Sequence, residues 1–243
     1  MYTFLKSVVK NIIPEEILIR NEDQFRKLLK PFYHGKNHEC NICRTKLKKF
    51  AQLENGQLIC PVCGSLPRTR RLNMLLENEF LNPGSAFLDF SPSRMLYKKW
   101  KKRKDISYYP TDFENEFLSD YRYDITAIDA EDEKFDLMVC YHILEHIAED
   151  QKAMSELYRV LKKGGAVLIQ TPFKEGEIYE DESIKTSEER LRHFGQEDHV
   201  RIYSVGGLEL RLKNAGFQVT VRTFSEDRYY GYSRNEKVLI CRK

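Results

Sequence analysis

From residue 85 onward, short apolar runs alternate with segments whose apolar residues recur at helical spacing. Three of the runs are typical of buried strands: Ala86 to Phe90, Ile106 to Thr111 and Phe135 to Tyr141. Arg94 to Lys104 lies between the first two runs and predicts a helix, which completes a β-α-β unit. A short helix at Glu114 to Asp120 and a third strand near Tyr123 are expected before the last run.

The same alternation continues toward the C-terminus. Glu149 to Lys162 carries its apolar residues on one helical stripe, and Gly164-Gly165 is expected to end that helix before a strand at Ala166 to Thr171. The remaining elements are a helix at Val205 to Asn214, followed by a stop at Gly216, and strands at Phe217 to Phe224 and Lys237 to Cys241. The pattern predicts an α/β fold with a doubly wound, mostly parallel sheet and a C-terminal antiparallel hairpin.

The first thirteen residues have a different pattern. Apolar residues recur at helical spacing, but Lys6, Lys10 and Pro14 interrupt them before a signal peptide or a membrane span could form. We therefore expect a cytoplasmic protein with no transmembrane segment. Packing of residues 1–13 against their own domain is the more common outcome for such a helix, and contact with a membrane surface is the alternative.

The composition is ordinary for a globular protein. The 243 residues are 41% hydrophobic with a net charge of +3, and no repeat or low-complexity tract is visible. Basic runs occur at Arg44 to Lys49 and Lys98 to Lys104, and an acidic one at Glu175 to Glu189. Such runs are most often solvated faces, and a phosphate-binding surface is the less common interpretation.

Four of the six cysteines form two closely spaced pairs. Cys40 and Cys43 are separated by two residues, as are Cys60 and Cys63, and 16 residues lie between the pairs. This spacing is typical of two metal knuckles, and four thiolates give zinc a closed tetrahedral site with a structural role. Disulfides are the competing interpretation, but a cytoplasmic chain would keep them reduced.

The segment between the pairs supports a zinc ribbon. Asn55-Gly56 is a dipeptide suited to a β-hairpin turn. Cys140 and Cys241 lie within apolar runs instead and are expected to be inert core residues. The domains expected from these patterns are an N-terminal helical segment at 1–35, a zinc ribbon with a linking helix at 36–82, and the α/β domain at 83–243.

Ligands of open parallel sheets bind beyond the carboxyl ends of the strands, so the residues that follow each strand are candidates for a binding site. Asp89 and its neighbours end the first predicted strand, and Asp112 ends the second. Asp124 ends the third, and Tyr141-His142 ends the fourth.

The residues at these strand ends resemble class I, type 11-like, S-adenosylmethionine-dependent methyltransferases. The resemblance is carried by Phe87 to Phe90, Thr111-Asp112, Tyr123 to Thr126, Phe135 to His146 and Leu161 to Gly165, and spans roughly residues 85 to 243. Cys60 to Arg68 and Phe194 to Arg201 are similar to a bacterial subgroup in which a zinc ribbon precedes this domain. The resemblance implies a Rossmann-like fold, a structural zinc ion and S-adenosylmethionine as cofactor.

The resemblance also implies which residues hold the cofactor. Asp112 would accept hydrogen bonds from both ribose hydroxyls, and Asp124 would lie near the adenine edge. The full set of expected cofactor-binding residues is Asp89, Phe90, Ser91, Asp112, Phe113, Asp124, Ile125 and Tyr141. One departure stands out, because Ser91-Pro92-Ser93-Arg94 replaces the glycine-rich turn that usually follows the first strand.

Two histidines are candidates for catalysis. His142 ends a strand and could contact cofactor or substrate; Glu145 and His146, which complete an H-x-x-E-H pattern, are expected to be structural rather than part of a zinc peptidase. Residues 173–201 form an insertion long enough to be a substrate lid. Within it lie four ionisable residues, His193, Asp198, His199 and Arg201, of which His199 is the candidate general base.

The sequence thus predicts methyl transfer to an O or N nucleophile of an acceptor that is small or contains a sugar. One alternative is an RNA methyltransferase whose ribbon presents the nucleic acid. The other is a non-catalytic module that no longer admits the cofactor at the altered turn. Cofactor binding separates the last alternative from both enzymes.

Overall fold

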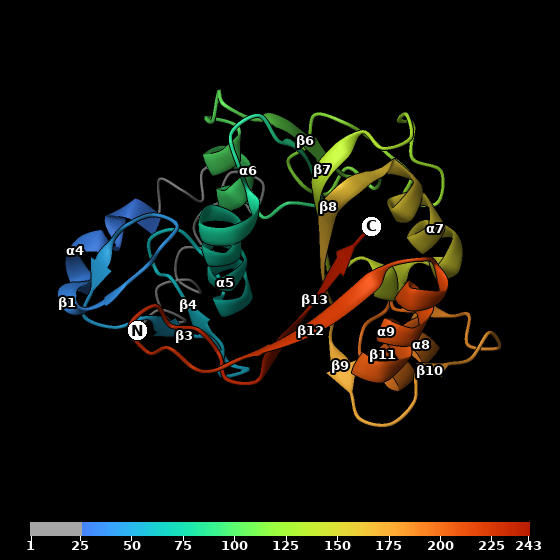
Figure 1. The fold of residues 1–243 in the computed structure, drawn as a ribbon. Coiled ribbons are helices and arrows are strands. Elements are labelled where there is room, and N and C mark those ends of the chain that lie inside the picture. Colours follow the sequence, from blue (N-terminus) through green and yellow to red (C-terminus); the bar gives the residue numbers. More distant parts are fainter. Residues whose placement is uncertain (1–25) are drawn as a thin grey trace. The chain divides into compact units, whose positions relative to one another are not determined.

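The computed structural model describes residues 26–243, which form two compact units (Figure 1). Among these residues, the cysteine unit contains 26–79 and 224–236, and the sheet unit contains 80–223 and 237–243. The predicted helix at residues 1–13, and with it the membrane-surface alternative, lies outside the described residues. No helix between residues 26 and 243 combines the length and the apolar character needed to cross a membrane.

The sheet unit is built on a central sheet. Within the described residues its strands follow the order β12-β13-β8-β7-β5-β6, with bounds β5 Ala86–Phe90, β6 Ser107–Thr111, β7 Phe135–Tyr141, β8 Leu161–Gln170, β12 Gln218–Phe224 and β13 Glu236–Arg242. β5 pairs in parallel with both β6 and β7, and β7 pairs in parallel with β8. β13 is antiparallel to β8. The predicted doubly wound, mostly parallel sheet with antiparallel C-terminal strands is confirmed.

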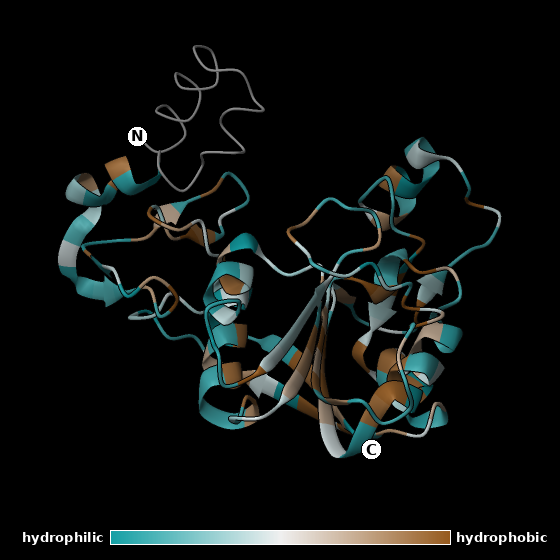
Figure 2. Cartoon of the chain, turned by 90° about the horizontal axis from the view of Figure 1, so that it is seen from above, coloured by the Kyte–Doolittle hydropathy of each residue, from teal (hydrophilic) through white to brown (hydrophobic). Residues whose placement is uncertain are grey.

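Helices cover both faces of this sheet. α6 (Arg94–Trp100) lies on one face, and α7 (Asp150–Val160) and α9 (Val205–Asn214) lie on the other (Figure 1). α7 buries the stripe that its periodicity predicts, including Ala153, Met154 and Leu157. Hydrophobic residues follow the central strands and the sheet-facing sides of the helices (Figure 2). Cys140 and Cys241 belong to this apolar core, as expected.

Three details of the predicted elements differ in the structure. Residues Glu114 to Asp120 form an irregular loop instead of a helix, because the Asp112 side chain accepts hydrogen bonds from two of the loop's backbone N–H groups. Gly164 and Gly165 do not end α7, which stops at Val160; both lie inside β8. The strand expected near Tyr123 is reduced to a parallel bridge between Thr111 and Tyr121.

The insertion after β8 is folded. It contains β9 (Phe173–Lys174), β10 (Tyr179–Glu180) and α8 (Ser187–Phe194), and leads into β11 (Arg201–Ser204). β11 pairs with both β9 and β10 in a small second sheet. α8 begins with a capping box between Thr186 and Glu189 and ends at Gly195, whose φ is 85°.

The cysteine unit consists of short strands and a helix. β1 (His34–Glu39) pairs with β2 (Lys46–Leu47), and β3 (Ala51–Gln52) pairs with β4 (Leu58–Ile59). The β3–β4 hairpin turns at Asn55-Gly56, where Gly56 has a φ of 81°, so the predicted hairpin is confirmed. A short helical turn, α4 (Lys30–Tyr33), precedes β1, and α5 (Pro67–Leu75) is followed by the π-helical turn η1 (Leu76–Phe80).

Residues 224–236 join this unit through two arginines of α5. Arg70, which is fully buried, donates to the carbonyl oxygens of Tyr230 and Gly231 at 2.8 and 2.6 Å. Arg71 donates to the carbonyl oxygen of Ser225 and contacts the carboxylate of Glu236 at 3.4 Å. The segment between β12 and β13 is thus fixed by guanidinium groups from the cysteine unit.

Candidate functional sites at the cysteine cluster and the strand ends

The four predicted zinc ligands converge in the cysteine unit. One sulfur atom from each of Cys40, Cys43, Cys60 and Cys63 lies within 4.8 Å of the others. All six cysteines of the chain, each within the described residues, are free thiols. Neighbouring thiols and then burial raise the pKa of Cys60, so in the absence of an ion this group keeps its proton. The cluster has the donor set and closure of a structural zinc site.

The two cysteine pairs adopt the same local geometry. The Cys40 N–H donates to the carbonyl oxygen of Thr45 at 3.1 Å, and the Cys60 N–H donates to that of Ser65 at 2.9 Å. In each knuckle the residue after the second cysteine is left-handed, with φ of 56° at Arg44 and 78° at Gly64. Equivalent turns from both pairs are what two knuckles around one ion require.

At the carboxyl ends of β5 and β6, Ser91 and Asp112 lie together. Ser91 Oγ donates to Asp112 Oδ1 at 2.6 Å, and the backbone N–H groups of Glu116 and Phe117 donate to Oδ2 at 2.6 and 3.0 Å. The carboxylate is buried and anchored, yet Oδ1 accepts only one of these bonds and keeps lone-pair capacity for a further donor. Asp112 is therefore positioned at the strand edge where the sequence predicts a ribose.

The turn after β5 forms without glycine. Ser91 has a φ of 45°, the left-handed conformation that glycine adopts most easily. Its N–H donates to the carbonyl oxygen of Thr111 at 2.8 Å, which ties the turn to β6. Serine thus supplies both the backbone conformation and a hydroxyl bond to Asp112, and the turn fits the expected cofactor without the usual glycines.

Asp89 lies within β5, inside the sheet. It is 2% exposed, and its Oδ2 accepts a hydrogen bond from the Tyr108 hydroxyl at 2.9 Å. Burial raises the pKa of Asp89 to about 7, and the bond from Tyr108 opposes this rise. The side chain is therefore buried and bonded to β6, and neither its pKa nor its partner Tyr108 was foreseen from the sequence.

The other predicted cofactor residues occupy different environments. Asp124 Oδ1 accepts from the backbone and hydroxyl of Thr126, both at 2.8 Å, in a local turn. Phe113 is 46% exposed, with the Arg122 guanidinium 5.1 Å from its ring centre. The remaining three are more covered: Phe90 and Ile125 are buried, and Tyr141 is partly buried. An exposed ring beside Asp112 suits contact with an adenine.

The end of β7 carries a second group of ionisable side chains. His142 has a φ of 57°, and its Nδ1 lies 3.3 Å from Oε1 of Glu145. His146 Nδ1 lies 2.9 Å from Oδ2 of Asp198, and the His146 and His199 rings meet edge to face at 4.6 Å. The structure therefore gathers His142 and His199, the two predicted catalytic histidines, with Glu145, His146 and Asp198.

The charge states within this group follow from burial and from the neighbours. Burial alone would raise the pKa of Glu145, but His142 and His146 outweigh it and hold the value below its usual range. Burial, and then His146, lower the pKa of His199. At neutral pH Glu145 is thus an anion and His199 a neutral imidazole. His193 is engaged elsewhere, because its Nδ1 lies 2.7 Å from the Tyr179 hydroxyl.

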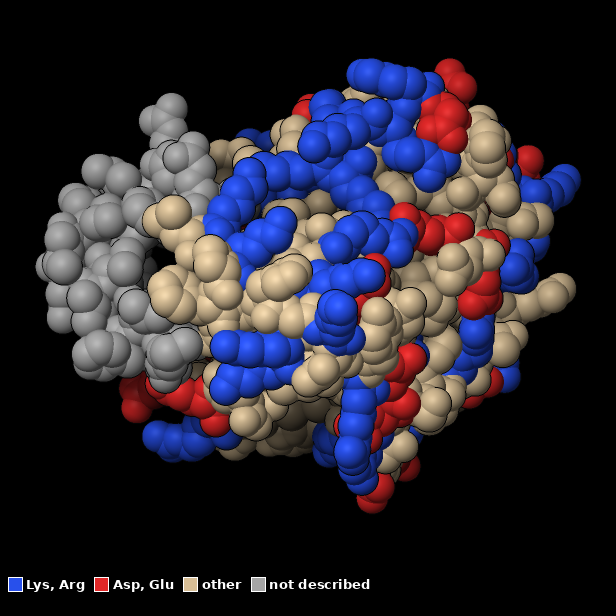
Figure 3. Space-filling model, turned by 90° about the vertical axis from the view of Figure 1, so that its left-hand side faces the viewer, with Lys and Arg blue, Asp and Glu red and all other residues tan. Residues whose placement is uncertain are grey.

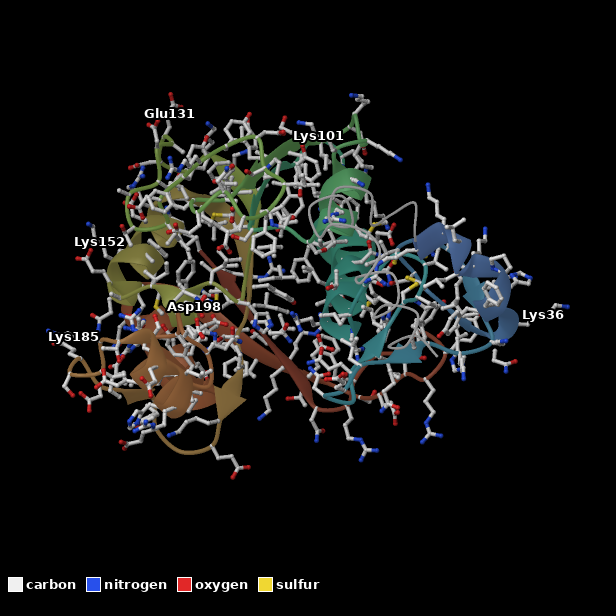
Figure 4. The ribbon with its side chains drawn as sticks, turned by 180° about the vertical axis from the view of Figure 1, so that it is seen from behind. Lys36, Lys101, Glu131, Lys152, Lys185 and Asp198 are labelled. Carbon is white, nitrogen blue, oxygen red and sulfur yellow. The ribbon has the colours of Figure 1, made fainter. Side chains whose placement is uncertain are left out.

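Arg201 fixes the segment that carries His199 to the loop after β7. Its guanidinium donates to the carbonyl oxygens of Leu144 and Ala148 and to the carboxylate of Glu180. The Val200 N–H donates to the carbonyl oxygen of Glu145 at 2.9 Å. Figure 4 shows Asp198 on this segment, between α8 and β11. Arg201 is accordingly a positioning residue.

Residues of both basic runs, Arg44 to Lys49 and Lys98 to Lys104, form ion pairs with acidic side chains. Arg44 contacts Glu77 at 3.3 Å, and Lys101 and Arg103 pair with Asp120 and Asp105. Lys and Arg side chains are numerous on the face drawn in Figure 3, where they lie among acidic and uncharged residues. These contacts are typical of solvated faces.

Comparison with known proteins agrees with this geometry. The family model described as a methyltransferase domain matches residues 63–221. No curated protein matches the chain. Among solved structures, an S-adenosylmethionine-dependent methyltransferase from Archaeoglobus fulgidus is 14% identical with a TM-score of 0.53, covering 72% of this chain and 93% of that one. A possible histamine N-methyltransferase from Thermotoga maritima is 16% identical with a TM-score of 0.50, covering 73% of this chain and 88% of that one.

The fold and the strand-end residues define an S-adenosylmethionine-dependent methyltransferase fold. The chain belongs to the methyltransferase-domain family, and a four-cysteine cluster accompanies that domain. At such low identity the two solved structures support the fold alone.

Proposed function

We infer that this protein is an S-adenosylmethionine-dependent methyltransferase that acts on an O or N nucleophile of a small or sugar-containing acceptor. The observation that carries the proposal is the anchored Asp112 carboxylate at the end of β6, bonded to Ser91 at the end of β5. In this fold the edge formed by these strand ends is the ligand-binding edge.

The residues have separate roles in this proposal. Asp112 holds the ribose, the exposed ring of Phe113 contacts the adenine, and the left-handed Ser91 lets the backbone turn away from the bound cofactor. His142 and the insertion at 173–201 face the acceptor. S-adenosylmethionine supplies an activated methyl group, so the chain's main tasks are alignment and removal of a proton from the acceptor.

In the cysteine unit, the proposal assigns one structural zinc ion to Cys40, Cys43, Cys60 and Cys63. Four thiolates fill its coordination shell and leave no position for a substrate. The zinc ion therefore acts on folding and takes no part in methyl transfer.

Calorimetric titration with S-adenosylmethionine and S-adenosylhomocysteine tests the cofactor site. We expect wild-type protein to bind both and Asp112→Ala to bind at least about tenfold more weakly, because it loses a charge-assisted hydrogen bond. Asp136→Ala is the matched control: Asp136 is the second residue of β7, near the amino ends of the parallel strands, and it also accepts a backbone hydrogen bond, from Ala86 at 2.8 Å. Equal weakening by both substitutions, or no binding to wild-type protein, would refute the assignment.

A further inference from the structure

Glu145 is a buried carboxylate that lacks ordinary hydrogen bonds. It is 1% exposed, and neither of its oxygens has a hydrogen-bond partner among the described residues. The His142 ring is beside it, with Nδ1 lying 3.3 Å from Oε1. A buried carboxyl group without hydrogen-bond partners is costly, and coordination of a cation is one of the ways in which proteins compensate for it.

Two imidazole rings complete a set of metal ligands around this carboxylate. Glu145, His146 and His199 each offer a ligand atom, and the three atoms lie within 4.8 Å of one another. Glu145 and His199 are buried, and His146 is partly buried. One carboxylate and two imidazoles match the ligands of divalent transition-metal sites and leave positions open for an exogenous ligand.

The surroundings of the three ligands resemble those of an assembled metal site. Asp198 Oδ2 lies 2.9 Å from Nδ1 of His146, which leaves Nε2 as the nitrogen available to an ion. Such a carboxylate partner orients a ligating histidine and increases its basicity. The bond from Val200 N–H to the Glu145 carbonyl, at 2.9 Å, holds the segment that carries His199 against the loop that carries the other two ligands.

We propose that Glu145, His146 and His199 bind a divalent transition-metal ion at the carboxyl end of β7, and that this ion contacts a hydroxyl group of the acceptor. The location supports that role. His142 directly follows β7, and β7 pairs with β5, whose end carries the Ser91 turn. The ion site is thus on the same sheet edge as the cofactor site. The hydroxyl assignment rests on the proposed methyltransferase function, whereas the ion site does not.

Contact with a metal ion favours oxygen over nitrogen as the methylated atom. A metal ion lowers the pKa of a hydroxyl that it contacts, so the oxygen loses its proton to water near neutral pH. A lone pair of that oxygen then forms a bond to the methyl carbon, the carbon–sulfur bond breaks, and its electron pair stays on sulfur. The products are a methyl ether, S-adenosylhomocysteine and a proton taken up by water.

Manganese binding to zinc-loaded protein tests the ion site without any substrate. Mn²⁺ competes poorly with zinc for a four-thiolate site. The concentration of free Mn²⁺ is measured directly by electron paramagnetic resonance. We expect one Mn²⁺ per chain. Glu145→Gln and His199→Ala should weaken binding at least about 100-fold, and Asp198→Ala about tenfold, as for an outer partner of a ligand.

His193→Ala is the matched control, because His193 belongs to the same insertion but is bonded to Tyr179 instead. It should bind Mn²⁺ as wild-type protein does. A second readout separates metal binding from a structural role. Mn²⁺ should raise the unfolding temperature of wild-type protein and leave that of Glu145→Gln unchanged, while without added Mn²⁺ the variant should be at least as stable as wild-type protein. A variant that is less stable under both conditions would contradict the ion site.

The outcomes distinguish the two proposals. Absence of Mn²⁺ binding, or equal binding by wild-type protein and Glu145→Gln, would overturn the ion site even if S-adenosylmethionine binds. Mn²⁺ binding without S-adenosylmethionine binding would support the ion site and overturn the methyltransferase function. Methylation of hydroxyl acceptors that depends on Mn²⁺ would support the acceptor class, and metal-independent methylation of amines alone would contradict it.

Discussion

The cysteine unit and the sheet unit are stabilised by different kinds of interaction. The sheet unit has one extended apolar core, in which residues of β5, β7 and β8 pack against α7 and α9. The cysteine unit has short strands, and its interior contains four thiols and the buried guanidinium of Arg70. In the sheet unit the hydrophobic effect dominates, whereas the cysteine unit depends on particular polar atoms and, in our proposal, on a zinc ion.

This difference indicates which changes should destabilise each unit. An apolar core loses stability gradually when methyl groups are removed, because many contacts contribute to it. A unit organised around the proposed zinc ion and one buried guanidinium should lose its structure when either is lost. The difference can be tested by perturbing each unit separately.

The largest effect should follow loss of the zinc ion. Structural zinc contributes on the order of 10 kcal/mol of binding free energy that is also folding free energy. In Cys60→Ser, or after chelation, we expect backbone amides of the cysteine unit to lose hydrogen-exchange protection while those of β5 and β7 keep it. Cys140→Ala is the control and should keep the zinc ion. Simultaneous loss of protection in both units would contradict the separation.

The second effect concerns Arg70. Its guanidinium donates to four backbone carbonyls, those of Leu58, Ser65, Tyr230 and Gly231. Arg70→Met removes one donor from each of these carbonyls, of which that of Ser65 still accepts from the Cys60 N–H, and should lower the free energy of unfolding by about 3 to 5 kcal/mol in urea titrations.

Arg159→Met in the sheet unit is the comparison. Arg159 also makes several hydrogen bonds, but its side chain is 32% exposed, so water can replace them. Its loss should cost about 1 kcal/mol. Equal costs for the two arginines would show that burial does not set the difference.

The third effect is a pH dependence of the sheet unit. Because the pKa of Asp89 is raised to about 7 in the folded state, its contribution to stability is full below the unfolded pKa near 4 and is lost as pH rises through 7. Between pH 5 and pH 8, wild-type protein should lose about 3 kcal/mol relative to Asp89→Asn, whose side chain does not titrate. Parallel stability curves for the two proteins, measured by urea unfolding across this range, would refute the raised pKa.

The smallest effect concerns the turn without glycine. Ser91→Gly and Ser91→Ala both remove the hydroxyl, but only alanine must hold the left-handed φ of 45°. The glycine variant should therefore be more stable by about 1 kcal/mol. Ser93 has a φ of −59°, which alanine adopts without strain, so Ser93→Ala should be more stable than Ser93→Gly. Thermal unfolding of the four variants measures the relative stability of the glycine and alanine variants at each position.

Much of the sheet unit could be predicted from its sequence. The bounds of β5, β7 and α9 match the expected runs because apolar periodicity reflects burial directly. The helix expected at Glu114 to Asp120 was wrong because a side chain outside that segment, Asp112, binds its backbone. Periodicity within a segment carries no information about such a contact.

The contents of the sites were harder to predict. The cysteine spacing indicated the four-thiol cluster, because the ligands come in local pairs. The partnership of Glu145 and His146 with His199 was missed, since it joins segments that are distant in the sequence and meet only in the fold. Membership of residues 224–236 in the cysteine unit was missed for a similar reason, since hydrogen bonds from arginine to carbonyl oxygens leave no pattern in the sequence.

The central claim is that S-adenosylmethionine binds at the carboxyl ends of β5 and β6. A crystal structure of the full chain with S-adenosylhomocysteine tests it most directly. We predict that the ribose hydroxyls lie within hydrogen-bonding distance of Asp112 and that the backbone at Ser91 keeps its left-handed conformation. A ligand bound elsewhere on the chain, or none at a saturating concentration, would contradict the account.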